Sequence, residues 1–170
     1  MATPTTLPAA FVSGAILTAD QMNNLRGAFR ILQVVTATAT TQVQNNTNVF
    51  ADTGLTVTIT PQSSSSKVLV FGAHNGLAKN STNASSSVTT QLLKGASVLS
   101  VISKGAQYTG TAIWNVGSES FFYLDSPAVT TATTYKTQIA SANNNDGALI
   151  HANIGFGTGI SYIVAMEVSA

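Results

Sequence analysis

The hexapeptide Leu55-Thr56-Val57-Thr58-Ile59-Thr60 (LTVTIT) alternates apolar and hydroxyl side chains without a break. Successive side chains of a β-strand point to opposite faces of its sheet, so this period of two predicts a strand with one buried face and one threonine-lined face. Pro61 and the serine run at 63–66 follow at once and predict a turn. The stretch is therefore typical of a half-buried strand in an antiparallel sheet.

Strand-like segments recur along most of the chain. They are predicted at 31–36, 55–60, 67–72, 87–93, 97–103, 112–116, 119–124, 133–140, 148–154 and 161–168. Turn-forming residues such as Lys94-Gly95 and Asp125-Ser126-Pro127 separate them. No helical pattern of about 10–15 residues lies between them, which argues against a parallel α/β sheet. The residues indicate an all-β sandwich or barrel, and we expect an antiparallel, jelly-roll-like β-sandwich of about 8–10 strands.

The composition excludes several classes of function. Charged residues make up 8% of the chain, whereas it contains 24 Thr, 18 Ser and 13 Asn. The net charge of +1 provides no field to attract nucleic acid or an acidic membrane, so neither is expected as a partner. Cysteine is absent, which excludes disulfides, thiol catalysis and thiolate metal sites. No apolar run approaches the roughly 20 residues of a spanning helix, and the first residues lack the positive start of a signal peptide.

The first 30 residues differ from the rest. Residues 1–10 are rich in Pro, Thr and Ala and predict an extended arm. A short helix is predicted at 19–29, because Thr18 can cap it and Gln21 has the capping-box spacing. The residues expected to anchor this helix to a partner surface are Leu17, Met22, Leu25 and Phe29. We therefore expect two parts: an attachment element at 1–30 and a β-sandwich domain at 31–170.

Catalytic and metal-binding constellations are not found. His74 precedes Asn75-Gly76 and is interpreted as a turn residue, and His151 as a structural strand residue. No serine occupies a G-x-S-x-G elbow, and the carboxylates show no spacing that argues for a catalytic pair. We expect no catalytic residue, no metal site and no cofactor.

Two binding hypotheses remain. Trp114 and Tyr108 are candidates for a platform that stacks on sugars, while the run 121–123 must lie partly in the core because neighbouring side chains of a strand alternate between faces. Threonine-clad strand faces can also be buried against another subunit at little desolvation cost. The alternative is that threonine is abundant only because it favours strands.

Two stretches resemble a known family. The segment 11–29 (FVSGAILTADQMNNLRGAF) is similar to an N-terminal motif, roughly G-x-x-L-T-A-x-x-M/V-N, of tailed-bacteriophage structural proteins. In the segment 30–73, ILQVV, DTGL, ITP, a serine-rich turn and SKVLV follow in the order of a β-domain common in phage genomes. The segments 123–141 (YLDSPAVTTATTYKTQIAS) and 162–169 (YIVAMEVS) resemble its closing strands.

The resemblance implies a non-enzymatic structural protein on the surface of a virion. Its members are fibre, appendage or minor structural proteins, and such appendages are commonly homotrimers that contact capsid, neck or tail proteins. A capsid decoration (cement) protein that forms a β knob on the head is the first alternative, because the chain has no long repetitive shaft. A carbohydrate-binding module for host-surface glycans is the second.

Overall fold

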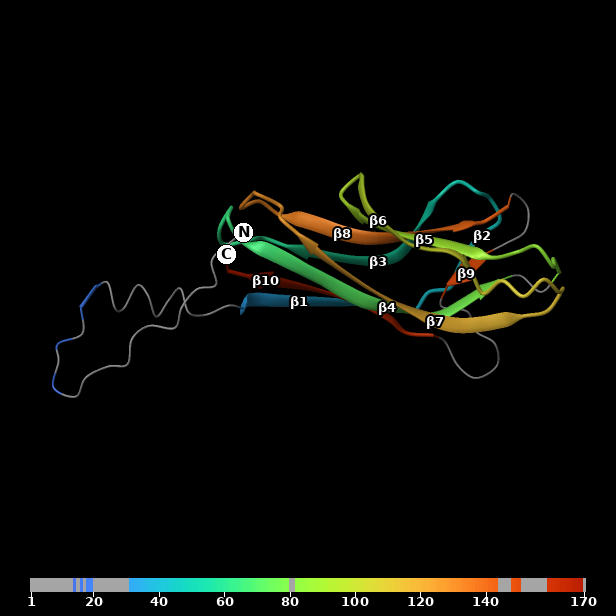
Figure 1. The fold of residues 1–170 in the computed structure, drawn as a ribbon, viewed down its shortest axis with the longest axis horizontal. Coiled ribbons are helices and arrows are strands. Elements are labelled where there is room, and N and C mark those ends of the chain that lie inside the picture. Colours follow the sequence, from blue (N-terminus) through green and yellow to red (C-terminus); the bar gives the residue numbers. More distant parts are fainter. Residues whose placement is uncertain are drawn as a thin grey trace.

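The computed structural model describes residues 31–79, 82–143, 148–150 and 159–169, together with Gly14, Ile16, Thr18 and Ala19. These residues form two antiparallel β-sheets packed face to face (Figure 1). The prediction of an all-β antiparallel sandwich is thus confirmed. The expected anchoring residues lie outside the described residues, as does His151. These anchoring residues are Leu17, Met22, Leu25 and Phe29.

Sheet A, in the lower layer of Figure 1, is four strands wide. Its elements are β1 (Ile31–Ala39), β2 (Val43–Asn45), β4 (Lys67–Lys79), β7 (Asn115–Asp125), β9 (Ala148–Ile150) and β10 (Ser161–Val168). β1 pairs with β10 and β2 with β9, while β10 and β9 pair with successive parts of β4. β1 and β2 therefore behave as one interrupted strand, and β9 and β10 as another.

Sheet B, in the upper layer, contains β3 (Ala51–Ile59), β5 (Val88–Lys94), β6 (Ser97–Ala106) and β8 (Thr133–Ser141) in the order β3-β8-β5-β6. With each interrupted strand counted once, the chain order gives eight strands. Sheet A then holds the first, eighth, third and sixth, and sheet B the second, seventh, fourth and fifth. This is the strand order of a jelly roll, as expected.

The predicted alternation of β3 is present in the structure. Leu55, Val57 and Ile59 are buried, whereas Thr56 and Thr58 are exposed. The buried side chains pack against apolar residues of both sheets. Gly72 allows a close approach within this core, because a Cβ there would lie 2.8 Å from the ring of Phe121. Apolar packing between the sheets therefore holds the sandwich together.

Several local predictions differ from the structure. β3 begins at Ala51 and β4 ends at Lys79, so both are longer than the strands predicted at 55–60 and 67–72. A separate strand at 112–116 is wrong, since β7 begins at Asn115 and continues through Gly117 to Asp125. The pairing of Gly117 with Leu77 of β4 keeps the strand continuous at a residue with weak strand preference. The short β2 was not predicted. The predicted strand at 148–154 agrees with β9 at Ala148–Ile150, and residues 151–154 lie outside the described residues. Within the described residues, no helix is long and apolar enough to cross a membrane.

Candidate assembly surface

The outer face of sheet A is built from the side chains of β1, β10, β4 and β7. Antiparallel register places these side chains in rows across the sheet. From β1 to β7, the rows are Val34-Met166-Leu69-Leu124, Thr36-Val164-Phe71-Phe122 and Thr38-Tyr162-Ala73-Ser120. Nine of these twelve side chains are apolar and none is charged. We refer to these twelve residues as the apolar face.

Several large side chains of the apolar face are open to water. Phe122 is 82% exposed, Leu124 54%, Val34 50% and Tyr162 44%. The outer face of an antiparallel sheet is ordinarily polar, because only its inner face packs on the core. Contiguous exposed apolar patches on soluble proteins mark places where another surface binds. The apolar face is therefore the strongest candidate for a functional surface.

This surface was not predicted from the sequence. The signal was present in β4 and β10, which begin KVLVFGA and SYIVAMEV. Such near-continuous apolar runs are typical of strands that are buried on both faces, in contrast to the alternation of LTVTIT. In the described structure, these two strands lie next to each other in the middle of sheet A.

The outer face of sheet B is chemically different. Lys136 Nζ donates to Asp52 Oδ2 at 2.8 Å, and Gln138 Nε2 donates to Asp52 Oδ1 at 2.7 Å. These hydrogen bonds hold the pKa of Asp52 below its ordinary value. Gln91 Nε2 donates to Gln138 Oε1 at 2.7 Å, which extends the network to a third strand.

Threonine hydroxyls complete the polar part of this outer face. Those of Thr58 and Thr134 are 2.8 Å apart across β3 and β8. We refer to Asp52, Thr56, Thr58, Thr134, Lys136, Gln138 and Gln91 as the polar face. Exposed apolar side chains of sheet B, Val98 and Val101, are confined to β6. The polar face satisfies its own hydrogen bonds and suits contact with water.

A layer of polar side chains crosses the interior. It lies between the apolar cluster that contains Leu55 and a second apolar cluster that contains Leu77. His74 of β4 is fully buried, and its Nε2 lies 3.0 Å from Thr137 Oγ1. Its Nδ1 lies 3.4 Å from Glu119 Oε2, which also accepts a hydrogen bond from Thr90 Oγ1 at 2.6 Å. Burial raises the pKa of Glu119, but the hydrogen bonds from His74 and Thr90 outweigh it and lower the pKa overall. The interpretation of His74 as a turn residue is wrong, because β4 continues through it to Lys79 and pairs with β7.

The order Thr137, His74 and Glu119 resembles a nucleophile, a base and an orienting carboxylate. However, Thr137 and His74 are both fully buried, so a substrate cannot reach the hydroxyl. The Thr137 hydroxyl also lies 2.7 Å from the Thr53 hydroxyl, so it already has a hydrogen-bond partner within the core. The arrangement therefore satisfies buried polar groups and joins the two sheets, and it is not placed for catalysis.

The remaining described carboxylates do not form a catalytic pair. Glu167 is buried at the end of β10, where it accepts hydrogen bonds from Gln33 Nε2 at 2.6 Å and from the Gln62 backbone at 2.8 Å. Burial raises its pKa, but these hydrogen bonds lower it overall. Asp125 accepts from Tyr135 and Lys94. Among the described residues, no group of three or more His, Asp or Glu could hold a metal ion.

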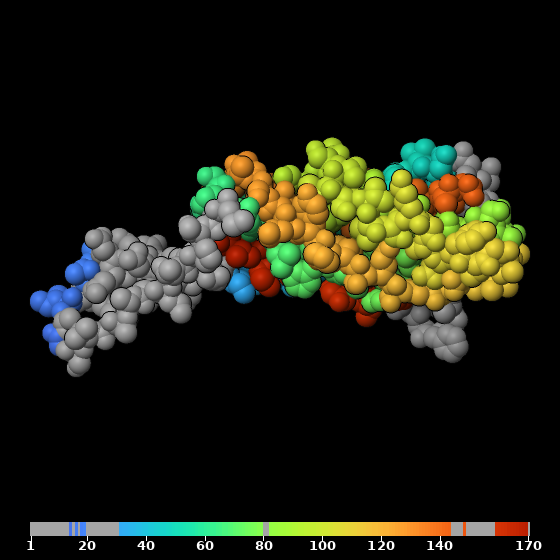
Figure 2. All heavy atoms as spheres, viewed as in Figure 1, coloured from blue at the N-terminus to red at the C-terminus, as the bar shows by residue number. Residues whose placement is uncertain are grey.

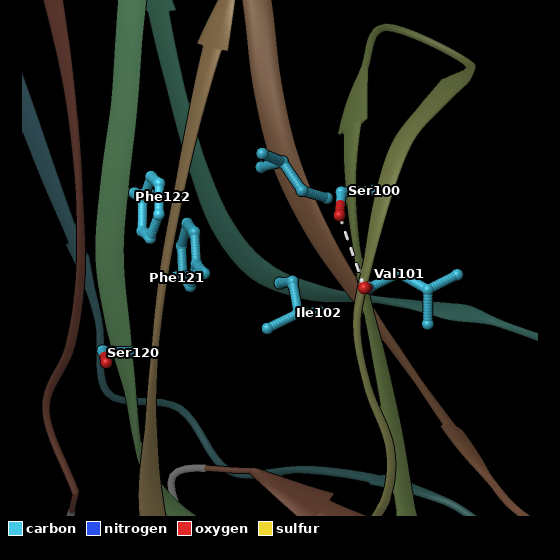
Figure 3. A pocket seen from close by; sticks show the side chains of 7 residues that line it. Ser100, Val101, Ile102, Ser120, Phe121 and Phe122 are labelled. Atoms are coloured by element: carbon cyan, nitrogen blue, oxygen red, sulfur yellow. Dashed lines mark hydrogen bonds between the residues drawn. The ribbon is translucent and has the colours of Figure 1, made fainter.

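A cleft of about 190 Å³ lies where β6 and β7 form neighbouring edges of the two sheets. Figure 3 shows Ile102 in the gap between these strands, on the side of Phe121, while Ser100 donates to the Val101 carbonyl at 3.3 Å. Figure 2 shows the same edge from outside, with gold residues of the β7 region beside yellow-green residues of the β6 region. The cleft is smaller than the roughly 300 Å³ of a typical small-molecule site.

Trp114 and Tyr108, the candidates for sugar stacking, both lie in the connection between β6 and β7. Trp114 is 51% exposed and Tyr108 60% exposed. The ring centroid of Tyr108 lies 6.0 Å from Nζ of the buried Lys79, which also donates to the Thr111 carbonyl at 2.7 Å. Tyr108 therefore has a structural contact in addition to its exposed surface.

No protein-family model matches the chain, and no curated protein matches its sequence. Among solved structures, the chain is similar to the infectious bursal disease virus VP2 subviral particle, with a TM-score of 0.49 and 13% identity over 78% of this chain and 32% of that chain. It is also similar to the Gt strain structure of that virus, with a TM-score of 0.46 and 13% identity over 82% of this chain and 40% of the other. This chain thus spans about a third of the length of these viral chains, and the likeness concerns the fold alone.

Proposed function

We propose that the protein is a non-enzymatic structural protein of a bacteriophage virion. In this proposal, residues 1–30 attach the chain to the particle, and the β-sandwich projects from the particle surface as a fibre or appendage. Its partners are further copies of the chain, as a homotrimer, and capsid, neck or tail proteins.

The apolar face carries this proposal. A sheet with apolar residues on both sides is suited to lie between protein layers. Burial of its outer face removes apolar surface from water and leaves no charged side chain buried without a partner. The triad-like group of Thr137, His74 and Glu119 within the described residues is closed to substrate, which favours a mechanical role. The two phage-like stretches at 11–29 and 30–73 supply the virion context.

A capsid decoration protein is the alternative for the same features. The described sandwich suits a knob on the head as well as a short appendage. Immunoelectron microscopy of intact particles with an antibody to the sandwich distinguishes the two. Label at the tail or neck supports the appendage, label over the head supports decoration, and unlabelled particles contradict both.

The attachment role of residues 1–30 is tested by deletion. The described core lies entirely within 31–169, so the truncated chain is expected to keep its β-sheet circular dichroism spectrum. It should no longer co-sediment with particles that lack the wild-type protein, whereas the full chain should. Normal incorporation of the truncated chain would contradict the attachment role.

Glycan binding is a second candidate function, favoured by the exposure of Trp114 and Tyr108 on one connection. Trp114 is the only tryptophan, so its fluorescence reports directly on this site. Stacking on a sugar should change the emission on titration with host-surface oligosaccharides, and Trp114→Ala should remove the binding heat that isothermal titration calorimetry detects. Unchanged emission at millimolar sugar would contradict this function.

A further inference from the structure

We propose that the apolar face of sheet A is the contact surface between copies of this chain. The inference rests on the proposed function for the presence of further copies on the particle, and it names the surface through which two copies pair. It commits to a second copy of the chain as the occupant of the face.

Charge is the first argument for a second copy. The three rows of the apolar face contain no charged side chain, and Lys67 lies only at its rim, beside Val168. A strongly charged partner would lose hydration on this surface without gaining an ion pair. Another copy of the chain presents the same uncharged apolar rows, and its net charge of +1 causes little repulsion.

Area is the second argument. Four strands about 4.8 Å apart and three rows about 6.8 Å apart cover roughly 400 Å² of flat surface. Ile31, which is half-exposed, and Val168 add half of a fourth row, which brings the apolar footprint to roughly 450 Å². Two copies together then cover about 900 Å², which is near the smallest area of a specific interface. The contact is therefore expected to be reversible between isolated chains and to strengthen when many chains are arrayed.

Shape is the third argument. Inside the molecule, sheet A already packs against a twisted antiparallel sheet of similar width. Two twisted sheets pack face to face without special fitting, because their pleats and twist match. A second copy offers such a sheet at its own apolar face. Phe122 and Leu124 protrude most strongly, so they should contribute most to the contact.

The test measures the mass of the purified full-length chain by sedimentation equilibrium from about 1 to about 300 μM, without virus particles. The wild type is expected to associate into dimers, because two like faces that pack on each other close at two copies. Phe122→Lys/Leu124→Lys should weaken this association by at least about 100-fold, because it places charge on the contact. The matched control Thr56→Lys/Thr58→Lys, on the polar face, should associate as the wild type does.

Several outcomes would overturn the inference. One is a wild-type chain that stays monomeric at every concentration, as it would if residues 1–30 covered the face. Another is a Phe122→Lys/Leu124→Lys variant that keeps the wild-type mass. Circular dichroism checks the fold of both variants. A separate measurement covers the case of a misfolded variant: the chain has no cysteine, so Leu124→Cys and Thr58→Cys each introduce a single thiol.

A bifunctional thiol reagent should join copies through Cys introduced at 124 and not through Cys introduced at 58. Equal crosslinking of both variants would contradict the inference. These results are independent of particle binding, so a chain that associates but never joins a virion would refute the proposed function and leave the contact surface standing.

Discussion

On the outer side of sheet B, Lys136 and Gln138 both donate hydrogen bonds to Asp52. On the outer side of sheet A, Val164, Phe71 and Phe122 lie in one row. The only hydrogen-bonding side chain in that row is a threonine. Burial of the polar face would remove water from paired but still partly hydrated groups, which costs free energy. Burial of the apolar face would be favourable, because it removes apolar surface from water. The two faces of one small sandwich thus indicate which side meets water and which side meets protein.

The largest expected effect concerns inner and outer positions of each sheet. On β3, Ile59→Ala should lower the free energy of unfolding by about 2–5 kcal/mol, and Thr58→Ala by less than about 1 kcal/mol, because only Ile59 lies in the core. On β10, the stability losses at the inner and outer positions should differ less. We expect about 2–5 kcal/mol for Ile163→Ala and about 1 kcal/mol for Val164→Ala, because Val164 is half-buried. Urea denaturation measures all four. If Thr58→Ala lowered the free energy of unfolding as much as Ile59→Ala, the distinction between inner and outer positions would be wrong.

The next largest change in the free energy of unfolding is expected in the polar interior, which lies between the two outer faces. Glu119→Gln should cost about 1–3 kcal/mol at neutral pH, because Thr90 and His74 lose a charged acceptor. The folded pKa of Glu119 is lowered, so its stabilisation is complete above the unfolded value near 4.5 and is lost as the pH falls through the folded pKa. The difference between wild type and variant, measured by urea denaturation, should therefore shrink well below pH 4.5. A constant difference from pH 7 to about pH 2 would contradict this account.

The smallest effect belongs to the polar face. The ion pair of Lys136 and Asp52 is exposed, so Lys136→Ala should change the free energy of unfolding by less than about 1 kcal/mol, and less still at high salt. Association through the apolar face should not weaken between about 0.1 and about 1 M salt, since it involves no charge pair. Thermal unfolding and sedimentation at both salt concentrations check the two expectations. Salt-induced dissociation would show that charge, and not apolar burial, joins the copies.

Strands with a local sequence pattern were found from the sequence, whereas features that depend on contacts between distant residues were not. The run at 161–168 predicted β10 with its bounds, and the alternation of LTVTIT predicted the second half of β3, because side-chain period and β-branched residues act within a few positions. The role of His74 was misread because Asn75-Gly76 is typical of a turn. In the structure, β4 pairs with β7 on both sides of a local irregularity there, which keeps the strand running. The candidate surface was missed because it joins β1, β4, β7 and β10 from distant parts of the chain.

The amino-acid sequence by itself determined the all-β class, the absence of thiol chemistry and the side of β3 that faces the core, since each follows from composition or from a period of two. Only the tertiary structure decided which strands pair within the jelly roll, the inner layer of His74 and Glu119, and the apolar face. Each of these depends on register between strands that are far apart in the chain, and that register is set by the packing of the whole core.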